Sequence, residues 1–520
     1  MRVLIFHGYL LDGTGSNVYN ARLAEALTRQ GHEVHLLCQE RRPFDFGWVV
    51  AAGDWDGGEL RVAQREGASA EGRATVYRPD IGGLMPVYVP DRYEGVRALP
   101  LYEVDDALLD AYVEANVRAV RDVVERAKPD FALANHLVMG PLVLARALQG
   151  TGIPRLVKIH GSALEYVVKP HPRFLPHARE GLAGARAVLV GSRHTAESLW
   201  AAMDDEGLPG RTRLGPPGVD VGAFRPLETG AARDGLEALR ARLHAAAPIP
   251  TADPVNQVSS SPSSSSFARD ASEGARALAA LDPAADRIVV FVGKLIASKG
   301  VELLLAAWPR VVEAEPRARL VIVGFGSFRA GLEGLAADLA AGDLAAARAT
   351  VGEDGRRLPE LDAFLARADE TALRAAGAAM RRVVWTGRLD HGELADLLPA
   401  AEAIVVPSTF PEAFGMVAAE GAACGALPVV ARHSGLAEVS EALAADVPES
   451  VRPWLSFEVG PDSVVELASC LAGWLTAPEA VRAATREAIV AVARERWSWD
   501  GVARTLLSAA TDDLGDLPSP

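Results

Sequence analysis

The chain has 520 residues, of which 49% are hydrophobic and 23% charged, and its formal net charge is −15. That length is too great for one hydrophobic core, so we expect two or three domains. The absence of a basic run argues against a protein that binds nucleic acid through the phosphate backbone. The three cysteines are far apart and lack metal-ligand spacing, so neither a disulfide framework nor a cysteine metal site is predicted.

The sequence contains no stretch of about eighteen apolar residues, and it opens with a predicted strand at 3–7 instead of a cleavable signal. We therefore expect a cytoplasmic protein without a transmembrane segment. Most of the negative charge falls after residue 226, because the first 226 residues carry 26 Lys and Arg against 28 Asp and Glu. This nearly neutral first part leaves open a peripheral contact with a membrane.

Strand-like and helix-like segments alternate along residues 1–226, which predicts an α/β domain with a doubly wound, Rossmann-like parallel sheet. The predicted strands 3–7 and 33–37 are separated by a predicted helix over 16–29. Three later strands are predicted at 131–134, 155–159 and 187–190. Two stretches are too irregular to assign, at 41–73 and 84–101.

Residues 227–285 change character and are predicted to be a linker or insertion. They begin with a helical stretch rich in Ala, Arg and Glu and continue into the serine-rich run 259–266. A serine run with proline cannot bury enough apolar surface to offset its ordering entropy. We expect this run to carry no chemistry.

Residues 286–490 repeat the α/β pattern and are predicted to form a second Rossmann-like domain. The predicted strands are 287–292, 320–323, 383–385, 403–406 and 427–431. Residues 330–380 are longer than a crossover between strands requires, and they predict two or three Ala-rich helices. Such an addition elaborates the domain structurally, with a role in oligomerisation or acceptor choice as the alternative.

Two glutamates eight positions apart, Glu412 and Glu420, lie where a predicted strand ends and a helix begins. The helix is predicted to stop near Gly425, which places Glu412 on the loop and Glu420 in the helix. Backbone N–H groups around Gly415 would be unpaired at the positive end of the helix dipole and would suit a phosphate. Carboxylates suit hydroxyls, so this unit favours a ligand such as a nucleotide sugar. Two glutamates at this separation also occur by chance.

Lys294 and Lys299 follow the first strand of the second domain and precede a helix. Ammonium groups at a strand exit can neutralise a diphosphate leaving group as the glycosyl bond breaks. The alternative is two solvated surface lysines.

Other strand exits carry weaker candidates. Gly324 offers a close backbone approach, and Arg388 lies at the exit of the strand at 383–385. Asp390 and His391 follow it and could border a base pocket or cap a helix.

The first domain carries candidates at two strand exits. Gly13 and Gly15 precede the first helix, where backbone can approach an anion, although the spacing does not match the dinucleotide fingerprint and a tight turn is the alternative. His160 ends a strand and is followed by Gly161, so it is a candidate for a substrate hydroxyl, with a satisfied core histidine as the alternative.

Several short motifs together resemble the fourth family of retaining glycosyltransferases, whose GT-B fold has two Rossmann-like domains facing a central cleft. The motifs lie at 218–220 with 224–226, 293–295 with 299–300, 407–408 with 411–415 and Glu420, and 433–438. The resemblance covers nearly the whole chain apart from the serine-rich run and the extra helices. The combination is specific, although each motif is short.

The resemblance implies roles for the matching residues. Glu412 is expected to contact hydroxyls of the donor sugar, and Glu420 the ribose. Lys294 and Lys299 match positions that hold the diphosphate. The first of these is commonly arginine in the family, so Lys294 keeps the charge but loses the bidentate fork.

Further positions match the family in the same way. The backbone at Gly415, Met416 and Val417 should assist diphosphate binding. His160 matches a first-domain histidine near the donor sugar, and residues 13–15 match a loop near the β-phosphate. The last segment, 491–520, would contain a helix that returns to the first domain.

The implied activity is transfer of a hexosyl unit from a nucleoside diphosphate sugar to an acceptor hydroxyl, with retention at the anomeric carbon. The leaving diphosphate would take the acceptor proton on the same face, so neither a carboxylate nucleophile nor a cofactor or protein-held metal is expected. The acceptor could be a sugar, a lipid-linked molecule or a small molecule.

Three alternatives remain at this point. A GT-B sugar-nucleotide epimerase would use the same fold and donor but no acceptor. A nucleotide-sugar-binding scaffold would lack catalysis. A nicotinamide dehydrogenase is disfavoured by the missing dinucleotide fingerprint.

Overall fold

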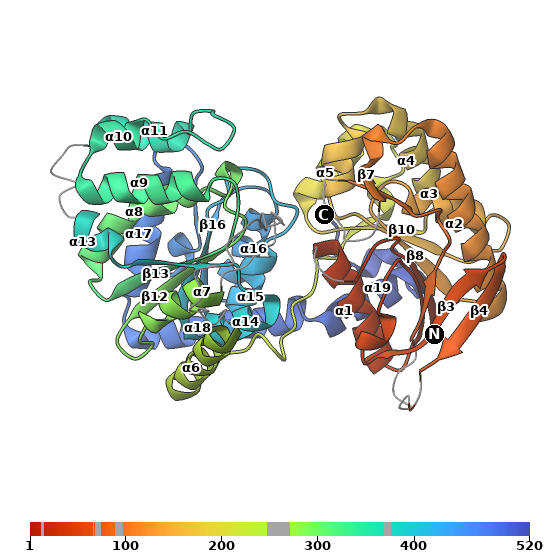
Figure 1. Ribbon diagram of the computed structural model, residues 1–520, viewed down its shortest axis with the longest axis horizontal. Helices are drawn as coiled ribbons and strands as arrows, with labels where there is room; N and C mark the ends of the chain where they lie inside the picture. Colours follow the sequence, from red (N-terminus) through yellow and green to blue (C-terminus); the bar gives the residue numbers. More distant parts are fainter. Residues whose placement is uncertain (12–14, 66, 68–73, 89–96, 247–270, 369–375) are drawn as a thin grey trace, which may run out of the picture. The chain divides into compact units, whose positions relative to one another are not determined.

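The computed structural model describes the chain except for residues 12–14, 66, 68–73, 89–96, 247–270 and 369–375. The chain divides into two compact units (Figure 1). Unit 1 comprises Met1–Gly218 together with Trp497–Pro520, and unit 2 comprises Val219–Arg496. The predicted serine-rich run lies outside the described residues.

The described strands of unit 1 form a nine-stranded sheet in the order β11-β10-β9-β8-β1-β2-β5-β3-β4. All neighbouring pairs are parallel except β3 with β4. The strands of this sheet are β1 (Arg2–Phe6), β2 (Glu33–Leu37), β3 (Val49–Asp56), β4 (Glu59–Gln64), β5 (Ala74–Arg78), β8 (Phe131–Asn135), β9 (Arg155–Lys158), β10 (Ala187–Val190) and β11 (Thr212–Leu214). A separate parallel pair consists of β6 (Leu84–Val87) and β7 (Arg97–Pro100).

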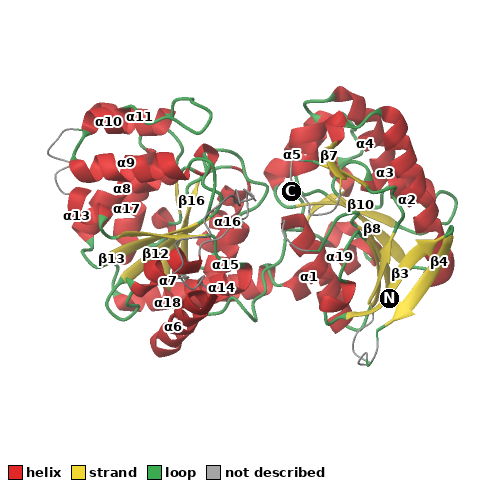
Figure 2. Cartoon of the chain, viewed as in Figure 1, coloured by secondary structure: helices red, strands yellow, loops and turns green. Residues whose placement is uncertain are grey.

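Helices cover both faces of this sheet (Figure 2). They are α1 (Gly15–Arg29), α2 (Asp106–Ala127), α3 (Gly140–Ala147), α4 (Leu175–Leu182), α5 (Arg193–Met203) and α19 (Trp499–Thr511). Alternate residues of a strand face opposite sides, and β1 accordingly sends Leu4 and Phe6 into one hydrophobic core and Val3 and Ile5 into another. The helix α19, from the end of the chain, packs against α1 in the second of these cores.

The described strands of unit 2 form a six-stranded sheet in the order β14-β13-β12-β15-β16-β17, and every neighbouring pair is parallel. The strands are β12 (Arg287–Val292), β13 (Ala318–Val323), β14 (Val383–Gly387), β15 (Ala401–Val406), β16 (Leu427–Ala431) and β17 (Ser456–Phe457). The helices are α6 (Thr229–Ala246), α7 (Ala271–Ala279), α8 (Val301–Ala314), α9 (Arg329–Ala341), α10 (Leu344–Arg348), α11 (Pro359–Arg367), α13 (Ala376–Met380), α14 (His391–Leu397), α15 (Met416–Cys424), α16 (Ser434–Ala444), α17 (Ser463–Leu475) and α18 (Glu479–Arg496).

The prediction of two Rossmann-like parallel-sheet units is confirmed. Strands β2, β10, β12 and β16 occupy the predicted ranges, and the other predicted strands agree to within two residues at each end. The stretches that could not be assigned from sequence contain β3, β4, β6 and β7. In the segment predicted as linker, α6 and α7 pack against each other and belong to unit 2, while the extra segment contains α9, α10, α11 and α13.

Each sheet has a point on either side of which the chain adds strands in opposite directions. In unit 1 this point lies between β1 and β8, and in unit 2 between β12 and β15. Ligands of open α/β sheets bind outside the carboxyl ends of the strands at such points. We therefore expect a ligand site in the loops that follow these four strands.

Among the described residues, no single helix combines the length and apolarity needed to cross a bilayer. The pair α17 and α18, which is bent by 105°, passes this test only when the two helices are taken together.

Candidate active site

The loops after β12 and β15 are locked together at the reversal point of unit 2. The amide of Thr409 donates a hydrogen bond to the carbonyl of Ser298 at 3.0 Å. Gly300 has a φ of +66°, and a Cβ at this position would lie 2.0 Å from the carbonyl oxygen of Pro407. A glycine is required here both for the left-handed backbone and for the close approach.

This contact brings Lys299 and Glu412 together, although they are distant in sequence. The Lys299 ammonium forms an ion pair with Oε1 of Glu412, and Ser408 Oγ donates to the same oxygen at 2.7 Å. The two charged side chains are 28% and 24% exposed, so a ligand can reach both. The ion pair joins the loops after β12 and β15, and the roles expected of the two residues toward a donor stay predictions.

The turn between β16 and α16 holds the Glu412 loop from the other side. Ser434 Oγ accepts from the Glu412 amide at 2.9 Å, and the Gly435 amide donates to the Glu412 carbonyl at 2.9 Å. His433 Nε2 lies 2.7 Å from the carbonyl of Ser408 and donates to it, and His433 Nδ1 lies 3.0 Å from Ser434 Oγ. This bracing role was not assigned from sequence.

The helix α15 begins directly beside this loop. Gly415, the N-cap residue before this helix, supplies no side-chain cap, and a Cβ there would lie 2.8 Å from Leu436 Cδ2. The first N–H groups of a helix have no partner within it and point along the positive end of its dipole. Met416 and Val417 are the first two residues of α15 and are half-buried, and amides at a helix start suit an anion.

Glu420 lies within α15 and is 4% exposed. Its Oε1 is 2.8 Å from His391 Nε2, and the His391 ring packs on Phe224 with 4.8 Å between ring centroids. The carboxylate therefore has a partner that is itself 41% exposed. Contact with a ribose, as the resemblance implies, would use the edge of this pair.

The remaining unit 2 candidates lie outside this cluster of contacts. Lys294 is exposed and makes no ion pair with a described residue. Arg388 pairs with Asp390 at 3.1 Å, and Asp390 forms a capping box with Glu393 at the start of α14. The expectation that Asp390 could cap a helix is confirmed.

Packing within the protein explains why position 324 is a glycine, without any ligand. A Cβ at this position would lie 2.0 Å from the carbonyl oxygen of Gly293, in the loop that follows the neighbouring strand. Its assignment to donor binding remains a prediction.

The extra helical segment reaches the loop that carries the two lysines. Glu353, between α10 and α11, accepts a hydrogen bond from the Ala297 amide at 2.8 Å through its carboxylate. A Cβ on Gly352 would lie 3.1 Å from Ala297 Cβ. The segment therefore braces the lysine loop, a contact that the sequence did not reveal.

In unit 1, His160 belongs to a buried polar network at the carboxyl ends of β1, β8 and β9. His160 Nε2 is 2.8 Å from Asn135 Oδ1, and Asn135 Nδ2 donates to Asn20 Oδ1 at 2.7 Å. Asn20 Nδ2 is 3.1 Å from His7 Nδ1, whose Nε2 lies 3.0 Å from the carbonyl of Leu10. Asn135 Oδ1 accepts from His160 Nε2, and His7 Nδ1 accepts from Asn20 Nδ2. Both histidines therefore carry their proton on Nε2, and Nδ1 of His160 is left as an acceptor.

Burial keeps the histidines of this network neutral. It lowers the pKa of His7 to about 4. Burial, together with the neighbouring His136, Lys158 and His7, lowers the pKa of His160 well below its usual value. Burial also lowers the pKa of Lys158 to about 7.

His136 is the strained member of this group. It is 2% exposed with a φ of +69°, and neither ring nitrogen has a hydrogen-bond partner among the described residues. Its ring lies 4.9 Å from that of His160.

Gly15 is the first residue of α1, and Gly13 lies outside the described residues.

The buried histidines predict acid sensitivity of unit 1. The folded-state pKa of His7 is below its unfolded value, so its stabilising contribution is complete above pH 6.5 and is lost as the pH falls toward 4. Between pH 7 and 5 we expect a loss of about 2 kcal/mol from this residue. His7→Gln cannot titrate, so urea unfolding should show a smaller difference between these pH values for the variant. An equal difference for both proteins would contradict the assignment.

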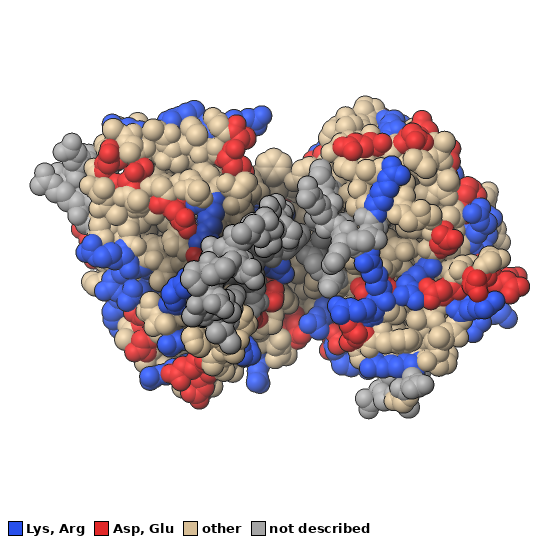
Figure 3. Space-filling model, in the orientation of Figure 1, with Lys and Arg blue, Asp and Glu red and all other residues tan. Residues whose placement is uncertain are grey.

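Charged side chains of both signs are interspersed on each unit in the view of Figure 3.

The described residues contain no group of three or more His, Cys, Asp or Glu placed to hold a metal ion. The three cysteines, Cys38, Cys424 and Cys470, are buried free thiols, and burial raises the pKa of each.

Comparison with known proteins identifies families for both halves. Residues 14–218 match the family described as glycosyl transferase 4-like domain, and residues 286–452 match glycosyl transferases group 1. A D-inositol 3-phosphate glycosyltransferase of Segniliparus rotundus is 28% identical over 58% of this chain and 47% of its own length. A GDP-mannose-dependent monoacylated alpha-(1-6)-phosphatidylinositol monomannoside mannosyltransferase of Corynebacterium glutamicum is 26% identical over 41% of this chain and 44% of its own. The chain thus spans about half the length of these curated relatives.

Solved structures show the same fold. Sucrose-phosphate synthase of Thermosynechococcus elongatus aligns with a TM-score of 0.55 at 19% identity, over 98% of this chain and 97% of its own. The Anabaena protein HepE, in complex with UDP and glucose, aligns with a TM-score of 0.53 at 15% identity over 99% of both chains. The resemblance seen in the sequence motifs is confirmed, and the chain belongs to the fourth family of glycosyltransferases, with the GT-B fold.

Proposed function

We propose that this enzyme transfers a hexosyl unit from a nucleoside diphosphate sugar to an acceptor hydroxyl with retention at the anomeric carbon. The observation that carries the proposal is the contact of Lys299 with Glu412 beside the N-terminus of α15. A cation, a carboxylate and helix amides meet there at a strand reversal point. The names of two similar proteins, which mention GDP-mannose and UDP, support a nucleotide-linked donor.

In this proposal the diphosphate lies against Lys299, with Lys294 and the amides of Gly415, Met416 and Val417 as further partners. The Glu412 carboxylate would repel a diphosphate if it stood alone, and its pairing with Lys299 screens that repulsion. Its second oxygen is then available to accept hydrogen bonds from sugar hydroxyls.

The nucleoside would lie toward Glu420, with Arg388 nearby. The pair of Glu420 with His391 offers a carboxylate edge for ribose hydroxyls. In unit 1, His160 remains the candidate for a substrate hydroxyl, and Gly13 and Gly15 remain candidates for close backbone approach. Gly324 remains such a candidate in unit 2.

In the proposed reaction, the bond from the anomeric carbon to the diphosphate oxygen breaks as the bond to the acceptor oxygen forms on the same face. The acceptor proton passes to the departing phosphate oxygen. The negative charge that grows on the diphosphate is stabilised by Lys299 and the helix amides, and such preorganised groups supply much of the catalysis in enzymes of this kind. No cofactor is required in this scheme.

The three free thiols support a reducing compartment such as the cytoplasm.

The first experiment is a thermal-shift panel of UDP-, GDP- and ADP-sugars with the full chain. We expect one base to raise the unfolding temperature clearly, because ligand binding to the folded state stabilises it. Product analysis with that donor should detect a glycoside whose anomeric configuration matches that of the donor. No response to any donor would overturn the proposal, and epimerised donor without glycoside would replace it with an epimerase.

Two glutamate variants distinguish an effect on donor affinity from an effect on kcat. Glu420→Ala should weaken donor binding about tenfold or more, as expected when a hydrogen bond to a charged group is removed. Glu412→Ala should leave donor binding within a few-fold while kcat falls, because it removes an anion from the diphosphate side and a partner from the sugar. Kinetics and thermal shifts with the best donor provide the measurement.

Glu441→Ala is the matched control, since Glu441 is an exposed glutamate on α16 of the same unit. It should behave as the wild type. If both site variants also behave as the wild type, the assignment of Glu412 and Glu420 is wrong.

A further inference from the structure

Unit 1 contains a cavity of about 440 Å³ that no part of the proposed donor site uses. Gln39 and Arg41 follow β2, Asp54 and Trp55 end β3, and Arg78 ends β5. These three strands are adjacent and mutually parallel. The cavity therefore opens at the carboxyl edge of the sheet, the edge at which α/β folds bind ligands.

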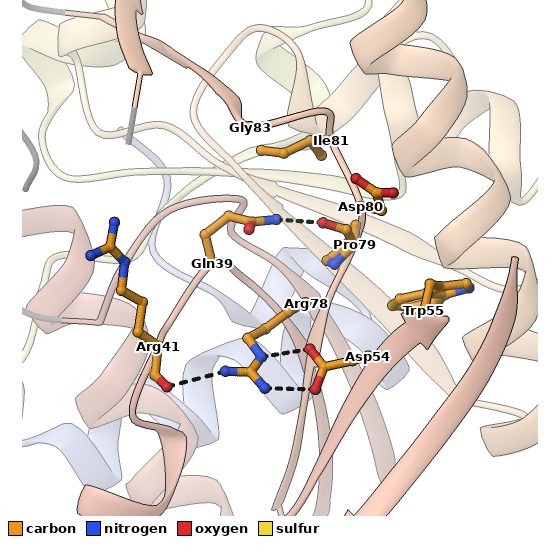
Figure 4. A pocket seen from close by; sticks show the side chains of 9 residues that line it. All are labelled: Gln39, Arg41, Asp54, Trp55, Arg78, Pro79, Asp80, Ile81 and Gly83. Carbon is orange, nitrogen blue, oxygen red and sulfur yellow. Dashed lines mark hydrogen bonds and ion pairs between the residues drawn. The ribbon is translucent and has the colours of Figure 1, made fainter. Parts of the chain in front are cut away.

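Hydrogen bonds join several of the residues that line the cavity (Figure 4). Arg78 forms a bidentate pair with Asp54 at 2.7 and 2.6 Å, and its third nitrogen donates to the Arg41 carbonyl at 3.1 Å. The Trp55 indole donates to Asp122 on α2 at 2.7 Å, which fixes the plane of the ring. A site whose side chains are already placed loses little entropy when a ligand binds.

The groups left available are of several kinds. The side-chain nitrogen of Gln39 donates one hydrogen bond to the Pro79 carbonyl at 2.9 Å, which leaves its side-chain oxygen as an acceptor. The Arg41 side chain is exposed and has no ion pair with a described residue, and Asp80 is also exposed. In Figure 4, Gln39 and Asp80 lie between Arg41 on one side and Trp55 on the other.

Charge balance decides which ligand suits the cavity. Arg78 and Asp54 neutralise each other, and Arg41 and Asp80 contribute one charge of each sign, so the cavity is neutral. A phosphate would gain from Arg41 but would be repelled by Asp80. Hydroxyl groups can donate to Asp80 and Gln39 and accept from Arg41, while the apolar face of a sugar ring packs on the Trp55 indole.

We infer that this cavity binds a neutral saccharide of one or two rings. Its volume lies toward the lower end of the ~300–1,000 Å³ typical of small-molecule sites, which fits one or two rings better than a long chain. The further step, that the bound saccharide is the acceptor, rests on the proposed function. The assignment then names the acceptor class as a sugar without a phosphate.

Saturation-transfer NMR with the full chain tests the cavity directly. The probes are methyl mannoside, methyl glucoside, mannobiose and maltose, with mannose 6-phosphate and glucose 6-phosphate as charged counterparts. We expect at least one neutral probe to bind more tightly than its charged counterpart. Trp55→Ala and Arg41→Ala should each weaken that binding about tenfold or more.

Arg61→Ala is the matched control, because Arg61 is an exposed arginine on β4 outside the cavity. It should leave saccharide binding unchanged. If Trp55→Ala fails to fold, Arg41→Ala carries the test, since the Arg41 side chain is exposed. Thermal shifts with the donor should be the same in all three variants, because none of Trp55, Arg41 and Arg61 belongs to the proposed donor site.

The outcomes separate this inference from the proposed function. A wild-type protein that binds a donor but none of the neutral probes overturns the inference alone. Preference for the phosphorylated probes, lost in Arg41→Ala, also overturns it and makes the cavity an anion site. Binding of neutral probes without binding of any donor overturns the proposed function and leaves the cavity assigned. If donor and probe both bind, mass spectrometry should find the probe glycosylated, and its absence would remove the acceptor role.

Discussion

Lys299→Ala is expected to lower kcat for glycosyl transfer about 10²–10³-fold, the usual effect of removing one preorganised group that stabilises charge in a transition state. The ammonium is placed by its pair with Glu412, and the departing diphosphate gains negative charge as the glycosyl bond breaks. Initial rates with the best donor from the panel provide the measurement.

Lys169→Ala is the control for this prediction. Lys169 is paired with Glu165 at 2.9 Å in unit 1, and the two side chains are 39% and 36% exposed. This variant also removes a lysine from an accessible ion pair, and it should keep kcat within about twofold of the wild type. If Lys299→Ala retains wild-type kcat while Lys169→Ala behaves as expected, Lys299 does not stabilise the leaving group.

The largest stability effect is expected from Gly300→Ala, with a loss of about 3–5 kcal/mol in the free energy of unfolding of unit 2. The left-handed φ of +66° disfavours alanine, and the new Cβ would lie 2.0 Å from the Pro407 carbonyl oxygen. That oxygen belongs to the backbone, so no side-chain rotation can relieve the contact. The loops after β12 and β15 would have to separate, which would also move Lys299 away from Glu412.

Gly342→Ala isolates the backbone part of this effect. Gly342 ends α9 with a φ of +71°, and a Cβ there would meet no atom within 4 Å. Its cost should be about 1–2 kcal/mol, the price of a left-handed residue alone. Urea unfolding of the two variants compares them directly. Equal losses would mean that the two loops are not in close contact in solution.

Much of the fold could be predicted because apolar runs in a parallel sheet are local signals. Strand β12 has its four central residues buried and was recognisable from sequence alone. Strand β4 pairs at the sheet edge and its residues are exposed or half-buried, so it lacks such a run and was missed. Strand β17 has only two residues, too few to show a period.

The candidate site divides in the same way. The motifs around Lys299 and Glu412 were recognisable as short patterns. The helix after Glu412 was predicted to begin at Phe414, two residues before α15 begins. The brace that Glu353 gives to Ala297 was not predictable, because the two residues are joined only by the packing of an irregular loop. The same holds for His433, whose hydrogen bond to Ser408 depends on β15 and β16 being neighbours.

The sequence by itself determined the two α/β units, most of their strands and the residue types of a site for phosphate and hydroxyl groups. These follow from patterns within a few tens of residues, where periodicity and capping act. Only the tertiary structure decided that Lys299 is paired with Glu412, that Gly324 is required by the Gly293 carbonyl, and that a neutral cavity forms across β2, β5 and β3. Those features depend on strand order and loop packing. Local sequence patterns do not indicate which residues far apart in the chain will come into contact.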